Sequence, residues 1–128
     1  GKNFVRTIAR LVRERKLIRV VDGQRGRPSS CEHLARTSLA LIEHHATGIY
    51  HVADGGECTW HEFACEIARH VNPNCEVVPC QDNEFPRLAK RPRYSVLDLN
   101  YIEAMLGPMP LWQENLANVL NRPEPDDD

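Results

Sequence analysis

The strongest constraint on the fold is a run of apolar residues at helical spacing that begins directly after Thr59. Thr59 and Glu62 form the Thr-x-x-Glu pattern of a capping box, in which two side chains satisfy backbone N–H groups at the start of a helix. The sequence therefore predicts a helix over residues 60–71 with a buried stripe. The stripe consists of Trp60, Phe63, Ala64, Ile67, Ala68 and Val71.

Short β-rich segments alternate with helical patterns along the rest of the chain. We expect strands over 17–21, 48–53 and 75–80, and further helices over 3–16, 31–44, 98–106 and 111–121. Strands separated by helices predict an α/β fold with a small parallel or mixed sheet and helices packed on it. A chain of 128 residues is long enough for one domain. We place that domain at 1–121 and expect the acidic end, 122–128, to be disordered.

Three of the other helices have a face expected to point into the core. The inward residues are Phe4, Val5, Ile8, Leu11 and Val12 in the first helix, Leu34, Ser38, Leu41 and Ile42 in the second, and Leu116, Val119 and Leu120 in the last.

The charge is uneven although the formal net charge is only −2. Residues 1–27 carry nine Lys or Arg against two acidic residues. A nucleic-acid-binding helix is disfavoured because no aromatic residues interleave these cations. A solvated basic face is the simpler interpretation. No apolar run approaches the roughly 18 residues of a membrane span.

Five cysteines without a signal-peptide pattern are typical of reduced thiols, so we expect a cytoplasmic protein. The chain begins at Gly1 on a helical pattern, which favours a fragment or a processed product.

The segment from Asp22 to Ser30 lies between an expected strand and an expected helix. Its two glycines permit backbone conformations that other residues resist, and Arg25 and Arg27 carry planar guanidinium groups suited to phosphate. Ser29 or Ser30 is expected to cap the next helix and to leave N–H groups facing an anion. A phosphate-binding loop and a structural turn both fit this pattern.

The same segment resembles only half of a dinucleotide-binding fingerprint. Gly23 and Gly26 have the right spacing, but Ser29 replaces the third glycine and Pro28 stands where the helix would begin. We therefore exclude a dinucleotide-binding loop here.

A second candidate segment runs from Phe85 to Asp98 and is rich in proline and arginine. It holds four cations in seven residues, and guanidinium groups on a proline-stiffened loop suit a diphosphate. A solvated basic loop is the alternative. The four cations are Arg87, Lys90, Arg91 and Arg93.

Metal binding and nucleophilic catalysis are both weakly supported. Cys58, His61 and Cys65 could hold a metal with Cys75, Cys80 or His70, but their spacing matches no closed zinc pattern. No Ser-His-Asp arrangement is recognisable, and the sequence contains no Tyr-x-x-x-Lys. We predict no catalytic residue in this chain.

Taken in order, several stretches resemble the C-terminal half of dTDP-4-dehydrorhamnose reductases, which are extended short-chain dehydrogenase/reductases. The resemblance extends to about Leu120. The matching stretches are Gly1-Lys-Asn-Phe-Val5, Asp22-x-Gln24-x-Gly26-x-Pro28-Ser29, Gly48-Ile-Tyr-His-Val-Ala53, Thr59-Trp-x-Glu-Phe-Ala64, Phe85-Pro-Arg87 and Arg91-Pro-x-x-Ser95-x-Leu97-Asp98.

The resemblance implies the substrate-binding lobe of an NADPH-dependent reductase that makes dTDP-L-rhamnose, without its Rossmann lobe. The Gly-rich NADP(H) loop and the Tyr-x-x-x-Lys pair would belong to that other lobe, so this chain alone should be inactive. The implied ligand is a dTDP-sugar. The residues expected to bind it are Asn3, Phe4, Gln24, Gly26, Pro28, Ser29, Arg87, Arg91 and Ser95.

Three positions depart from the family pattern. Ser29-Ser30 stands where Thr-Ser is common, His33 replaces a frequent Asp, and Tyr101 replaces a Lys. The changes at positions 33 and 101 leave the exact substrate open. Because some relatives of these reductases serve as subunits of another protein, the resemblance also implies an alternative, a non-catalytic sugar-nucleotide-binding or regulatory subunit of the same fold. An apolar face turned toward the absent lobe should be exposed and favour a homo-oligomer.

Overall fold

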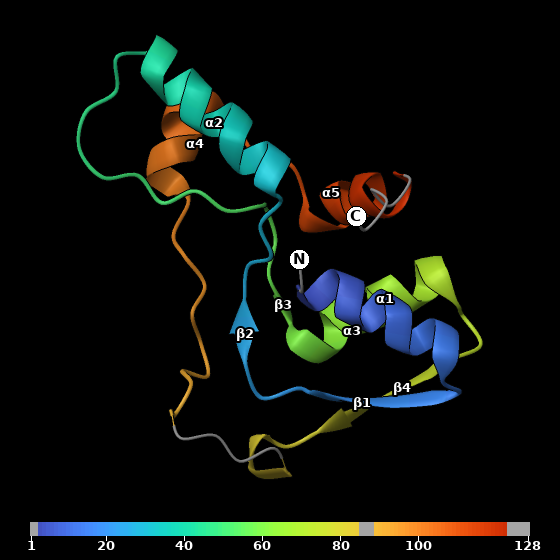
Figure 1. Cartoon of the computed structure of the whole chain (residues 1–128). Coiled ribbons are helices and arrows are strands. Elements are labelled where there is room, and N and C mark those ends of the chain that lie inside the picture. The colour runs from blue at the N-terminus through green and yellow to red at the C-terminus, as the bar shows by residue number, and fades with distance from the viewer. Residues whose placement is uncertain (1–2, 85–88, 123–128) are drawn as a thin grey trace.

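The computed structural model describes residues 3–84 and 89–122. It confirms the predicted α/β class, with small sheets and packed helices (Figure 1). The elements in chain order are α1 (Phe4–Glu14), β1 (Leu17–Val21), β2 (Arg25–Gly26), α2 (Cys31–Glu43), β3 (Cys58–Thr59), α3 (Trp60–Val71), β4 (Glu76–Cys80), the 3-10 helix η1 (Asp82–Glu84), α4 (Asn100–Leu106) and α5 (Trp112–Leu120).

The main core lies between a two-stranded parallel sheet and the helices α1, α3 and α5. β1 pairs with β4 from Leu17–Glu76 to Val21–Cys80, and α1 and α3 lie beside this sheet (Figure 1). Parallel strands need a long crossover connection, which the segment with α2 and α3 between β1 and β4 provides. The large side chains buried in this core include Ile8, Val12, Ile18, Val20, Phe63, Ile67, Trp112 and Leu116.

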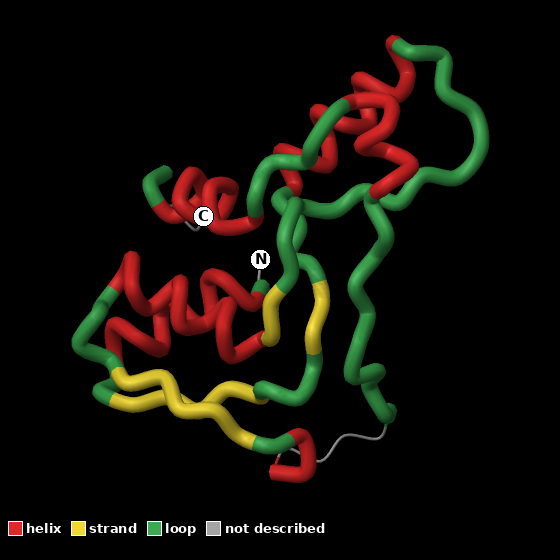
Figure 2. The backbone as a smooth tube through the Cα atoms, turned by 180° about the vertical axis from the view of Figure 1, so that it is seen from behind, coloured by secondary structure: helices red, strands yellow, loops and turns green. Residues whose placement is uncertain are grey.

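A second, smaller core joins α2 and α4, which form a separate lobe at the top of Figure 1. Ala53, Leu99, Ile102 and Met109 are buried in it. Long stretches without helix or strand connect the two lobes (Figure 2). Between them, β2 pairs antiparallel with β3.

Side chains accept backbone N–H groups at several helix starts, and the predicted capping box is confirmed. The Asn3 side chain accepts a hydrogen bond from the Arg6 N–H at 2.9 Å at the start of α1. Thr59 and Glu62 form both bonds of the capping box at α3. Asp98 accepts the N–H of Asn100 at 2.7 Å, although Leu99 is the N-cap of α4.

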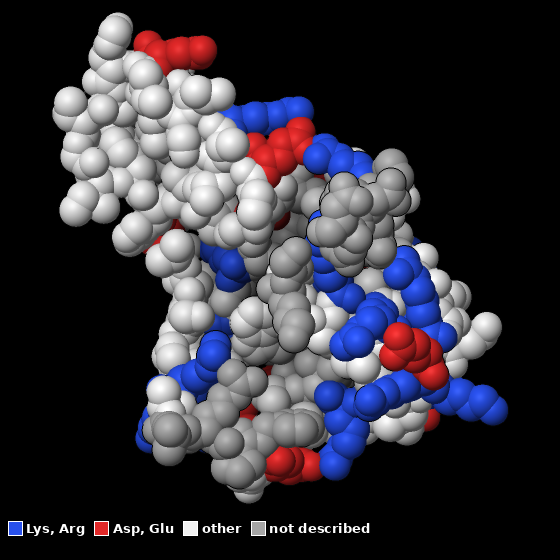
Figure 3. All heavy atoms as spheres, viewed as in Figure 1, with Lys and Arg blue, Asp and Glu red and all other residues white. Residues whose placement is uncertain are grey.

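The basic residues of α1 lie on its outer face, as expected for a solvated face. Arg6, Arg10 and Arg13 are exposed, whereas Ile8 and Val12 of the same helix are buried. Figure 3 shows Lys and Arg side chains gathered where α1 lies. No helix within 3–84 and 89–122 has the length and apolar character needed to cross a membrane.

The strand predicted at residues 48–53 is wrong. This stretch belongs to no strand, and none of the described strands pairs with it. Ile49 is 85% exposed at its start. The β-rich composition is real, but a strand also needs hydrogen bonds from a neighbouring strand.

The predicted inward faces of two helices also need correction. In α2 the buried residues are His33 and Thr37, whereas Leu34 and Ile42 are 45% and 70% exposed. In α5, Leu116 is buried as predicted but Val119 is 44% exposed. A helix whose apolar residues surround much of its circumference does not specify which face is buried.

Candidate functional site

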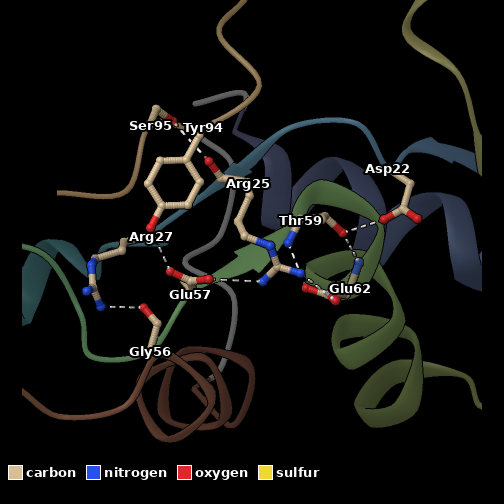
Figure 4. Close-up of polar contacts among 9 residues, drawn as sticks. All are labelled: Asp22, Arg25, Arg27, Gly56, Glu57, Thr59, Glu62, Tyr94 and Ser95. Atoms are coloured by element: carbon tan, nitrogen blue, oxygen red, sulfur yellow. Dashed lines mark hydrogen bonds and ion pairs between the residues drawn. The ribbon is translucent and has the colours of Figure 1, made fainter.

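The segment from Asp22 to Ser30 pairs with residues 93–95 of the second candidate segment. Arg25 donates its N–H to the Arg93 carbonyl at 2.8 Å, and its own carbonyl accepts the Ser95 N–H at 2.9 Å. Tyr94 therefore extends the pairing of β2 on the edge away from β3 (Figure 4). Gly26 lies so close to Ser95 that an added Cβ would be 3.2 Å from the Ser95 hydroxyl.

The Arg25 guanidinium contacts protein carboxylates rather than standing free for a phosphate. It lies 3.1 Å from Glu62 and 3.6 Å from Glu57. The Tyr94 hydroxyl donates to the same Glu57 at 3.4 Å (Figure 4). This network joins β2, α3 and the segment around Tyr94. Arg25 therefore stabilises the contact between these three parts of the chain.

Arg27 has a comparable role on the other side of β2. Its Nε donates to the Leu97 carbonyl at 2.8 Å, and a second guanidinium nitrogen donates to the Gly56 carbonyl at 2.7 Å. Both arginines that were expected to bind phosphate thus donate to acceptors of the protein itself.

A cleft of about 690 Å³ opens beside Arg27. Its size is within the usual range for small-molecule sites. The carboxylates of Glu57, Asp98 and Glu103 outnumber its one arginine, so the cleft suits hydroxyl or amine groups better than phosphate. Its lining consists of Arg27, Gly55, Gly56, Glu57, Tyr94, Val96, Leu97, Asp98, Leu99, Asn100 and Glu103.

A carboxylate of the protein itself, that of Asp54, lies at the start of α2. Ser30 is the N-cap, as predicted, and accepts the His33 N–H at 3.4 Å. Both oxygens of the buried Asp54 carboxylate lie 3.2 Å from the Ser30 N–H, and one lies 2.7 Å from His33 Nδ1. A dinucleotide pyrophosphate at this helix would meet that carboxylate, so these residues do not fit the cofactor.

The predicted ligand-binding residues do not all lie together. Two groups of neighbours can be distinguished, and the other residues lie apart from them. Gly26 and Ser95 lie together, with Gln24 nearby donating to Asp82 at 3.1 Å. Asn3 and Phe4 lie together at the start of α1. The Pro28 carbonyl accepts the Asp54 N–H at 3.3 Å. The side chains of Ser29 and Arg91 are exposed, and Arg87 lies outside the described residues.

None of the eight predicted residues that the structure describes lines the cleft. Its walls come from the turn at Gly55–Glu57 and from the segment 94–103. Asp54-Gly55-Gly56 is a sequence typical of a turn. Its proximity to Arg27 depends on tertiary contacts, which no local pattern shows.

The cluster of Asp22, His61 and Cys65 is not a nucleophilic triad. His61 Nε2 lies 3.0 Å from the Val77 carbonyl and 3.5 Å from the Cys65 sulfur. A carbonyl only accepts, so Nε2 carries hydrogen and cannot take the thiol proton. Burial raises the pKa of Cys65, and it raises that of Cys58 to about 12, so neither thiol is activated. Among the residues that the structure describes, no three His, Cys, Asp or Glu side chains are arranged so that they could hold a metal ion.

Comparison with known proteins gives one consistent family. The model of the RmlD substrate binding domain matches residues 1–124. The spore coat polysaccharide biosynthesis protein SpsK of Bacillus subtilis is 36% identical over 121 residues, which are 94% of this chain and 42% of that protein. The dTDP-4-dehydrorhamnose reductase of Escherichia coli is 32% identical in an alignment of 135 positions that covers 94% of this chain and 44% of that enzyme.

Solved structures of the same kind superimpose closely on this chain. A dTDP-4-dehydrorhamnose reductase from Clostridium acetobutylicum has a TM-score of 0.87 at 37% identity, covering 95% of this chain and 45% of that one. The Bacillus anthracis reductase, solved in complex with NADP, has a TM-score of 0.86 at 38% identity and covers 94% and 43%. This chain thus spans less than half the length of these relatives. The resemblance found in the sequence is confirmed: the chain belongs to the RmlD substrate-binding domain family.

Proposed function

We propose that this chain is the substrate-binding part of an NADPH-dependent dTDP-4-dehydrorhamnose reductase and that it holds the dTDP-sugar. The observation that carries this proposal is the pairing of β2 with Tyr94 and Ser95. It brings together two segments, far apart in the chain, that each have the composition of a ligand-binding loop. The family membership supports the same substrate class.

The proposed ligand contacts are the nine residues expected from the sequence. Among the proposed contacts that the structure describes, Arg91 is the candidate for the diphosphate because its side chain is exposed. The guanidinium groups of Arg25 and Arg27 instead bind acceptors of the protein itself. The acidic cleft adjoins this region and would receive the uncharged, hydroxylated part of the ligand in preference to the diphosphate.

Direct binding of thymidine diphosphate by calorimetry tests this proposal. We expect Arg91→Ala to weaken binding by about tenfold or more, because an arginine–phosphate bond is charge-assisted. Arg36→Ala is the matched control, since Arg36 is an exposed arginine that pairs with Glu32 on α2. If thymidine diphosphate does not bind the intact chain, the proposal is wrong.

Hydride transfer is proposed to need polypeptide beyond this chain. The Gly-rich NADP(H) loop and the Tyr-x-x-x-Lys pair are absent from the sequence, and the Asp54 carboxylate occupies the start of α2. We therefore expect no oxidation of NADPH when this chain is mixed with a dTDP-4-keto sugar. The reduced nicotinamide absorbs at ~340 nm and the oxidised form does not. A loss of this absorbance that depends on the substrate would contradict the expectation.

A further inference from the structure

Trp60 is unusual because it belongs to the apolar stripe of α3 and yet remains 38% exposed. The sequence pattern assigns it to the core with Phe63, which is buried. Its ring instead packs on Phe4 of α1, with ring centroids 4.6 Å apart and planes tilted by 52°. Phe4 also stacks on Phe63 at 5.5 Å. The indole is therefore supported from the core side and open on the other.

The position of Trp60 connects the two groups of proposed ligand-binding residues. It follows Thr59 directly, and Thr59 is paired with Arg25 in the β2–β3 ladder. Its ring partner Phe4 follows Asn3, the N-cap of α1. Figure 1 shows β3 leading into the start of α3 near the start of α1. Trp60 is thus linked to the start of α1 through its contact with Phe4, and to β2 through its chain neighbour Thr59.

We propose that Trp60, supported by Phe4, is the stacking platform for the pyrimidine base of the bound nucleotide. This inference rests on the proposed function and adds which residue recognises the base. Flat heteroaromatic rings stack well on indole, and such contacts contribute substantially to nucleotide binding. A platform held by a second ring needs little ordering when the base arrives.

The chemistry favours the base over the other parts of a sugar nucleotide. A diphosphate needs cations or N–H donors, and the sugar needs hydroxyl partners, which the polar cleft supplies. An apolar aromatic face offers neither. Among the parts of the ligand, the flat base makes the largest stacking contact with the indole.

Fluorescence and calorimetry on the intact chain test the proposal with thymidine diphosphate as the probe. The chain has two tryptophans, and Trp112 is buried at 5% exposure, so quenching on binding would report mainly on Trp60. We expect Trp60→Leu, which keeps an apolar side chain against Phe4 but removes the ring, to weaken binding by about tenfold or more. Trp60→Phe should retain most of the affinity. Tyr101→Ala, at an exposed and stacked tyrosine of α4, is the control and should bind as the wild type does.

The outcomes separate this inference from the proposed function. If the wild type and Trp60→Leu bind thymidine diphosphate equally, the stacking platform is wrong while the proposed function stands. If the wild type binds none, both are wrong. Quenching by a single-stranded oligothymidylate that exceeds quenching by the diphosphate and falls steeply with salt would assign the platform to nucleic acid and overturn the inference.

Discussion

At the scale of single residues, the buried pair of His33 and Asp54 explains one departure from the family pattern. Both side chains are buried, and the imidazole Nδ1 lies 2.7 Å from a carboxylate oxygen. Asp54 also receives the Ser30 N–H, so the pair ties the start of α2 to the turn that lines the cleft. A carboxylate that is buried in this way needs its partners.

The pair predicts a strong effect for the residue that the family often has at position 33. His33→Asp would place a second carboxylate against Asp54, and we expect a loss of about 3–5 kcal/mol in the free energy of unfolding, since it creates uncompensated buried charge. Urea unfolding measures this loss. The double variant with Asp54→Asn should recover much of it, and His33→Asn should cost less. Equal stability of His33→Asp and the wild type would show that the pair does not matter.

At the scale of the elements, local patterns predict what depends on local physics. The helix 60–71 and the strand 17–21 match α3 and β1 residue for residue, because the capping box and the apolar period mark the helix and the β-rich run marks the strand. β2 was not predicted, since its two residues become a strand only through pairing with β3 and Tyr94.

The stretch 48–53 shows the same limit from the opposite direction. Ile-Tyr-His-Val-Ala has the composition of a strand, but its ladder partner does not occur among the described residues. The site follows this rule as well. Residue types identified the loops around Gly26 and Ser95, whereas the exposure of Trp60 and the position of the turn at Gly55–Glu57 beside Arg27 emerged only from the packing. Side-chain chemistry is readable in a sequence, but tertiary proximity is not.

At the scale of the whole molecule, the lobe of α2 and α4 exposes an apolar surface. Leu34, Leu39 and Ile42 of α2 are 45%, 61% and 70% exposed, and Ile49 beside them in the chain is 85% exposed. Figure 3 shows few charged side chains over this lobe. Contiguous apolar surface of this kind usually marks an interface. We propose that it contacts the polypeptide that the longer relatives carry in addition to the part matched here.

This surface predicts that the chain self-associates when it is alone. Because burying apolar area is favourable by about 25 cal/mol per Å², two copies should cover each other's α2 faces in a concentration-dependent way. Sedimentation measured over a range of concentrations tests this expectation. Ile42→Glu should shift the equilibrium toward the monomer, because a charge would then be buried in the contact. Thr7→Glu places the same charge on the exposed face of α1 and should leave the association unchanged. A wild-type chain that stays monomeric at the highest concentrations would contradict an interface between copies at the α2 face.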